Sequence, residues 1–142
     1  MERKLLEINL SAIEWHLFNG GWKIHHIVKD EDFMPAEQWD GYKIFTLEGG
    51  SHSVITDEII TQNIEILPAN RSDLHYWRIN IDGKLAVERR RFSTDGDNLL
   101  NWLMKNEGLY PYEFFTKFNL HAENMKYFSG KIIQLTPFRY NL

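Results

Sequence analysis

Hydrophobic and polar residues alternate along much of the first 92 positions, and this pattern predicts β-strands. The strand-like runs cover 22–29, 42–47, 53–55 and 63–67, with two more on either side of Asp82-Gly83 between 74 and 92. Residues 30–41, which include Pro35, have the composition of a loop, Gly49-Gly50 that of a turn, and 57–61 is compatible with a helical turn. The pattern predicts an antiparallel sheet before residue 92.

The N-terminal segment fits two patterns. Apolar residues recur at helical spacing at Leu6, Leu10, Ile13 and Leu17. Residues 6–10 taken alone alternate as in a strand, but we favour a helix over the whole segment. Ser11 and Glu14 have the spacing of a capping box, so a helix could instead begin at Ser11. In both cases Asn19-Gly20 ends the helix.

Asp82-Gly83 between two strand-like runs is typical of a β-hairpin. A two-residue loop would mix polar and apolar residues on one face. A three-residue loop, with its glycine at the left-handed bulge position, instead pairs Ile79 with Leu85 and Trp77 with Val87. Because a slip of one residue exchanges the faces of a strand, we predict the three-residue loop.

After residue 94 the apolar period becomes helical. A helix is predicted between an Asp97 cap and a Gly108 stop, a second helix begins at Pro111, and 121–128 form a third short one. The predicted apolar stripes consist of Leu99, Leu100, Trp102, Leu103, Met104, Phe114, Phe115 and Phe118. Residues 131–135 form a closing strand, and Pro137 begins a tail. Strands followed by helices predict an α+β fold, a single domain over 1–142 with a mainly antiparallel sheet of about 5–7 strands and helices at the N-terminus and in the last third.

Composition narrows the function classes. The chain has 142 residues, a net charge of −4 and 14% aromatic residues, and its first 71 residues carry 6 Lys/Arg against 12 Asp/Glu. The absence of cysteine excludes disulfides, thiolate nucleophiles and cysteine-bound zinc or iron. An acidic chain is a poor ligand for phosphate backbones, so we expect no nucleic-acid binding, despite the cluster at Arg89-Arg90-Arg91. No apolar run approaches the roughly 18 residues of a membrane span, and we expect a cytoplasmic protein.

Four histidines fall on or beside predicted strands, at His25, His26, His52 and His75. The neighbours His25 and His26 face opposite sides of a strand, so at most one of them can join a given cluster. No spacing matches a metal or nucleophile motif. We therefore expect hydrogen-bonded or surface histidines, with no metal and no cofactor.

Gly20-Gly21-Trp22, at the start of a strand after an N-terminal helix, resembles the G-x-W that opens lipocalin-like barrels. That resemblance implies antiparallel strands around an apolar small ligand. The predicted helical segment at 97–128 is longer than this family leads one to expect. In the alternative interpretation, Trp22 is a residue of the core.

We expect a non-catalytic binding protein with a protein partner, of the inhibitor, immunity or adaptor type. One alternative is a small hydrolase or isomerase that uses His with Asp or Glu in a sheet-lined pocket, and another is a lipocalin-like binder of a small apolar ligand. The loop at 30–41 is the candidate binding segment, because it combines an aromatic ring with carboxylates. Its candidate residues are Trp39, Asp30, Glu31, Asp32 and Asp40. The ring of Trp39 either covers the core as a lid or is an exposed anchor.

Overall fold

The computed structural model describes residues 4–33, 39–47, 49–55, 59–68, 75–90, 94–120 and 127–142. Within these ranges the fold is α+β, with helices in the N-terminal part and in the last third, as the sequence predicts. The elements in chain order are β1 (Leu5–Asn9), α1 (Ala12–Asn19), β2 (His25–Lys29), the 3-10 helix η1 (Asp30–Asp32), β3 (Gly41–Phe45), β4 (Ser51–Ile55), β5 (Thr61–Pro68), β6 (His75–Ile81), β7 (Lys84–Arg90), β8 (Thr94–Asp95), α2 (Asp97–Glu107), α3 (Pro111–Lys117) and β9 (Phe128–Gln134).

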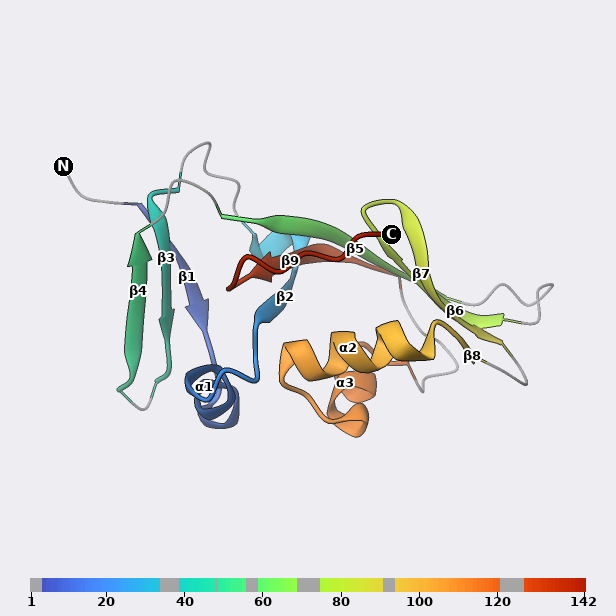
Figure 1. Cartoon of the computed structure of the whole chain (residues 1–142), viewed down its shortest axis with the longest axis horizontal. Coiled ribbons are helices and arrows are strands. Elements are labelled where there is room, and N and C mark those ends of the chain that lie inside the picture. Colours follow the sequence, from blue (N-terminus) through green and yellow to red (C-terminus); the bar gives the residue numbers. More distant parts are fainter. Residues whose placement is uncertain are drawn as a thin grey trace.

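The described strands form two sheets instead of one. The smaller has the order β1-β3-β4 and the larger the order β2-β9-β5-β6-β7-β8. All pairs are antiparallel except β1 with β3, which run parallel. Figure 1 shows the smaller sheet beside the β2–β9 end of the larger one, with β4 outermost. The larger sheet is open, with β2 and β8 at its edges, which differs from the barrel implied by the lipocalin resemblance.

Helices α2 and α3 cover one face of the larger sheet (Figure 1). Alternation along β5 and β6 directs one set of side chains to this face, and the helical period of α2 supplies the other set. The main buried residues of this first core are Ile64, Ile66, Trp77, Ile79, Val87, Leu100, Leu103, Met104, Phe114, Phe118 and Ile132. Trp102 is not among them. It lies outside the buried stripe of α2 and is exposed, so its predicted burial was wrong.

A second core lies on the other face of the β2–β9 end. The neighbours Ile132 and Ile133 on β9 point to opposite faces, the first toward the helices and the second toward the smaller sheet. The buried members of this second core are Leu6, Ile8, Leu10, Tyr42, Ile44, Ile133 and Leu135. Strand β9 is therefore covered on both faces, which explains its short run of consecutive apolar residues.

The N-terminal segment is a strand followed by a helix, so the prediction of a helix from residue 6 was wrong. Leu6 pairs with Tyr42 and Ile8 with Ile44 in the smaller sheet. Helix α1 instead begins after the capping box: the Ser11 hydroxyl accepts from the Glu14 amide at 3.2 Å, and the Ser11 amide donates to the Glu14 carboxylate at 3.2 Å. The helix ends at Gly20, as predicted.

The β6–β7 hairpin has a two-residue loop, so the predicted three-residue loop was wrong. Asp82 and Gly83 both have positive φ, 51° and 77°, which is the geometry of the turn that best matches the strand twist. The pair that closes the loop is Ile81 with Lys84.

The irregularity that keeps the apolar face in register lies further along β7, at Ala86. Asn80 pairs with Leu85 and Ile79 with Val87, so Ala86 is the extra residue of a bulge. Leu85 consequently faces solvent, while Val87 returns to the core. Gly96 packs on the bulge so closely that an added Cβ would lie 2.4 Å from the Ala86 carbonyl oxygen.

Three other expectations have mixed outcomes. The helix over 97–107 ends at Gly108 as predicted, but its N-cap is Gly96 and not Asp97. Of the helical turn expected at 57–61, the described residues 59–61 are not helical, and Thr61 begins β5. The short helix expected at 121–128 falls largely outside the described residues, although Phe128 begins β9. None of the described helices combines the length and apolar character that a membrane span requires.

Candidate functional site

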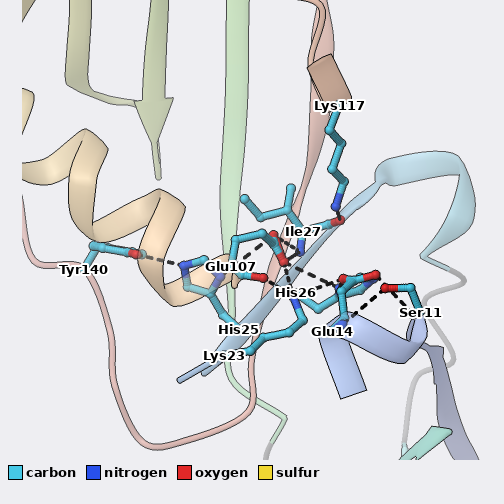
Figure 2. Close-up of polar contacts among 9 residues, drawn as sticks. All are labelled: Ser11, Glu14, Lys23, His25, His26, Ile27, Glu107, Lys117 and Tyr140. Atoms are coloured by element: carbon cyan, nitrogen blue, oxygen red, sulfur yellow. Dashed lines mark hydrogen bonds and ion pairs between the residues drawn. The ribbon is translucent and has the colours of Figure 1, made fainter. Parts of the chain in front are cut away.

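A buried ion pair joins two segments that are far apart in the sequence. Lys23 lies between α1 and β2, Glu107 is the last residue of α2, and both side chains are fully buried. The Lys23 ammonium donates to the Glu107 carboxylate at 2.5 Å and to the Glu107 carbonyl oxygen at 2.6 Å (Figure 2). Terminal carbonyls of a helix lack intrahelical partners and carry partial negative charge. The single ammonium therefore caps α2 and neutralises its terminal carboxylate.

The same cluster supplies hydrogen-bond partners for backbone groups at the edge of β2. Among the described strands, β2 pairs with β9 alone, on one side. On its other side, the Ile27 amide donates to the Glu107 carboxylate at 2.7 Å, and the Ile27 carbonyl accepts from the Lys117 ammonium at 3.3 Å. Side chains of α2 and α3 thus take the place of a neighbouring strand for this residue.

Glu14 and His26 extend the cluster toward the surface. The Glu14 carboxylate lies 3.5 Å from the Lys23 ammonium and 3.6 Å from Nδ1 of His26. Nδ1 of His26 is also 3.5 Å from the Glu107 carboxylate. Both side chains are partly exposed, at 18% for Glu14 and 13% for His26, so the cluster reaches solvent from this side.

The two carboxyl groups are held ionised. Burial by itself raises the pKa of Glu107, but the Lys23 and Lys117 ammonium groups and the nearby His26 outweigh it and hold that pKa well below its usual range. Burial likewise raises the pKa of Glu14, and Lys23 and His26 reverse the effect, so that the net shift is downward. The cluster therefore has two carboxylates, with Lys23 as their nearest fixed positive charge.

Glu14, His26 and Glu107 have the arrangement of a metal site, because one ligand atom from each lies within 4.8 Å of the others. The ammonium of Lys23 is already within ion-pair distance of both carboxylates. A divalent ion bound to those oxygens would be held next to this fixed positive charge, which opposes its binding. We interpret Lys23 as the cation of this cluster, and the expected absence of a metal stays a prediction.

His25 points away from His26 and connects to the C-terminal segment. Its Nε2 shares a hydrogen bond of 2.8 Å with the Tyr140 hydroxyl, which accepts another from the Asn106 amide at 3.0 Å. Burial lowers the pKa of His25 from 6.5 to about 4, against the opposing effect of the Glu107 carboxylate. Burial also raises the pKa of Tyr140. This neutral chain of hydrogen bonds fastens the C-terminal segment to α2.

Two hollows lie on the surface next to the cluster, and Leu109 lines both. The smaller, of about 360 Å³, is bordered by Glu14 of the cluster together with Tyr112 and Lys117. The larger, of about 470 Å³, lies between the end of α1 and the α2–α3 connection and is mainly apolar.

Two exposed aromatic side chains, Trp22 and Tyr110, line the larger hollow, and a third, Trp102, lies beside it next to Lys105. Trp22 is 60% exposed, Trp102 52% and Tyr110 76%. The Lys105 ammonium lies 4.9 Å from the ring centre of Trp102 and 5.7 Å from that of Trp22, so it joins the two indoles by cation–π contacts. We call these four residues and the hollow between them the aromatic face.

The acidic candidates of the 30–41 loop contact their own chain. Asp30 accepts a hydrogen bond from the Ser129 hydroxyl at 2.5 Å and lies 3.4 Å from the Lys131 ammonium, both on β9. Glu31 and Asp32 complete η1 and are exposed. The Asp40 carboxylate accepts from the Lys4 amide at 2.8 Å. Asp30 and Asp40 are thus bound to different sheets.

Trp39 is partly buried and packs against the second core, and its indole nitrogen is buried with no hydrogen-bond partner in the described part of the chain. Residues 34–38 of this loop lie outside the described ranges. The packing favours the lid over the exposed anchor, although binding by Trp39 stays a prediction.

The described histidine side chains do not gather as one cluster. His25 and His26 reach the same carboxylate from different sides, whereas the His52 ring lies 5.8 Å from that of Phe18 in contact with α1. The side chain of His75 lies outside the described residues.

Sequence reasoning missed Lys23, Glu107 and Lys105. Glu107 had a readable signal, because it lies seven residues after Leu100 and so continues the buried face of α2. Comparison with protein-family models, with curated proteins and with solved structures finds no match to this chain. The functional argument therefore depends on the geometry of the chain itself.

Proposed function

We propose that this chain is a cytoplasmic, non-catalytic interaction protein that binds a protein partner through the aromatic face. The supporting observation is the exposure of three large rings at one place: Trp22 and Tyr110 line the apolar hollow, Trp102 lies beside Lys105, and each ring is more than half exposed. Trp and Tyr are the residues most often found at the energetic centres of protein interfaces. Exposed aromatic residues that lie together at one place on the surface indicate a binding site more strongly than exposed apolar residues that are scattered singly.

The buried cluster supports this proposal as a scaffold. Lys23 and Glu107 fix the end of α1 against the end of α2, and these two ends form the walls of the larger hollow. Gly108 fits so closely against Lys23 and Leu17 that an added Cβ would lie 3.1 Å from the Cβ of Lys23 and 3.3 Å from a methyl carbon of Leu17. A surface held in place before binding loses less conformational entropy when it binds.

The proposal is tested by Trp22→Ala and Trp102→Ala, with Tyr127→Ala as a matched exposed aromatic remote from the face. Each variant is immobilised and exposed to extract of the native cell, and its melting temperature is measured in parallel. A partner should be retained by the wild type and by Tyr127→Ala, and lost from both tryptophan variants at unchanged melting temperature. Equal retention by all variants would refute the proposal.

A second candidate function is acid–base catalysis at His26. Its Nδ1 has no hydrogen-bond partner among the described residues, and Glu14 connects it to the hollow of about 360 Å³. Model esters, phosphoesters and glycosides should then be turned over by the wild type and not by His26→Gln. Activity that survives this substitution would exclude His26 as the base.

A further inference from the structure

We infer that the partner segment bound at the aromatic face presents a carboxylate beside an apolar side chain. This inference depends on the proposed function and names the chemistry of its partner. The apolar side chain would enter the hollow, and the carboxylate would bind the ammonium of Lys105. Three observations carry it: the charge of the lining, the surroundings of Lys105, and the shape of the surface.

The lining of the larger hollow carries one kind of charge. Its walls are mainly apolar, formed by residues such as Leu17, Met104, Leu109 and Pro111. Among the described residues that line it, Lys105 is the charged one and none is a carboxylate. The complementary ligand is therefore apolar with one negative group.

Lys105 is available to an incoming anion. Its ammonium lies over the faces of Trp22 and Trp102, and no carboxylate lies within ion-pair distance of it in the described residues. A π-face neutralises none of the charge and accepts no conventional hydrogen bond, so the three N–H donors of the ammonium can still reach a carboxylate. A hydrogen bond between this ammonium and a carboxylate would have charge on both groups, which makes it stronger than a neutral one.

The shape favours a peptide over a free fatty acid or a similar small amphiphile. A small ligand would fill the hollow but leave the outer surfaces of Trp102 and Tyr110 in water. A protein segment that crosses the hollow can cover these rings as well. The chain's net charge of −4 opposes a generally acidic partner, so the inference concerns one carboxylate beside one apolar residue.

A phage-displayed library of random peptides tests this chemistry on the intact chain. Selections are run in parallel on the wild type, on Trp22→Ala, on Lys105→Met and on Lys43→Met. Lys43 is the matched control, because its ammonium also lies over an aromatic ring, that of Phe45 at 5.9 Å, but in the smaller sheet. The wild type and Lys43→Met should enrich peptides with Asp or Glu within two positions of Leu, Ile, Phe or Trp.

A synthetic peptide of the selected consensus then quantifies the contact. Changing its acidic residue to the amide, or Lys105 to Met, should each weaken binding by about tenfold, and the two changes together should weaken it little further, as expected of one charge-assisted hydrogen bond. The dissociation constants come from fluorescence anisotropy of the labelled peptide.

The outcomes separate this inference from the proposed function. Suppose that the consensus disappears with Trp22→Ala but contains no acidic residue, or is selected equally on Lys105→Met. Either result overturns the inference and leaves the proposed function standing. Absence of enrichment above the Trp22→Ala background counts against both. Binding of sodium octanoate without any peptide enrichment would assign the hollow to a small amphiphile and overturn the inference.

Discussion

Replacing Glu107 by Gln tests whether the buried ion pair holds the helices on the sheet. The substitution preserves shape but removes the charge that faces the Lys23 ammonium at 2.5 Å, and it leaves that ammonium buried with Glu14 at 3.5 Å as its nearest anion. Removing one partner of a buried pair costs about 3–5 kcal/mol, because the other charge stays desolvated. For a chain of this size the loss corresponds to a fall in melting temperature of roughly 10–15 °C.

A double-mutant cycle separates the ion pair from local packing. Lys23→Met should also destabilise, since it leaves the fully buried Glu107 carboxylate without its ammonium partner. The double variant Lys23→Met with Glu107→Gln should be more stable than either single variant, because no uncompensated charge then lies between the two buried positions. The free energies of unfolding are measured by urea titration followed by circular dichroism, with a parallel thermal melt.

The free energy of unfolding measured at acidic pH gives a second test of the same ion pair. The pKa of Glu107 is lowered in the folded state, so its contribution to stability is present above the pKa of the unfolded chain and is lost as the pH falls through the folded value. Glu107→Gln should make the free energy of unfolding depend less on pH in this acidic range. A single variant that costs less than about 1 kcal/mol, or additive costs in the double variant, would refute the account of the pair as a coupled unit.

Four further predictions concern other parts of the chain. Folding lowers the pKa of His25 from 6.5 to about 4, so the folded chain binds this proton less readily, and about 3 kcal/mol of stability should be lost as the pH falls from 6.5 to 4. His25→Gln should remove that loss when the two proteins are compared by urea titration across this pH range. Gly83→Ala should cost about 1 kcal/mol through its positive φ alone, whereas Gly96→Ala should cost more, because its Cβ would also meet a carbonyl oxygen at 2.4 Å; equal melting temperatures would contradict this. Trp39→Ala should lower the melting temperature, because the ring packs on the second core, and a loss of partner capture at unchanged stability would instead identify it as an anchor. Dialysis against EDTA should leave the melting temperature unchanged, because Lys23 supplies the positive charge between the carboxylates, and a drop restored by zinc would show a metal.

Local signals predicted the elements that depend on neighbours in the sequence. The capping box at Ser11 places the start of α1, the glycine at 108 ends α2, and Pro111 begins α3. In each case the decisive contact lies within a few residues, so spacing alone is informative.

Long-range pairing decided the elements that the sequence analysis missed. Residues 5–9 form a strand because they pair in parallel with 41–45, and this pairing outweighs the helical spacing of their apolar residues. Lys23 and Glu107 are 84 residues apart, and no motif relates them. Trp22 and Trp102 look like core residues by type, yet both lie beside Lys105 on the exposed side of the helices, which only the packing of α1 against α2 determines.

The position of β9 between β2 and β5 has a consequence for synthesis on the ribosome. Strand β2 has β9 as its strand partner, and β9 also joins β2 to β5, but about 100 residues separate 25–29 from 128–134. At roughly 5–20 residues per second, the edge of β2 waits about 5–20 seconds before its partner strand is made. During that interval its apolar side chains and open backbone are available to other chains. We therefore expect slower translation to increase aggregation of the nascent chain.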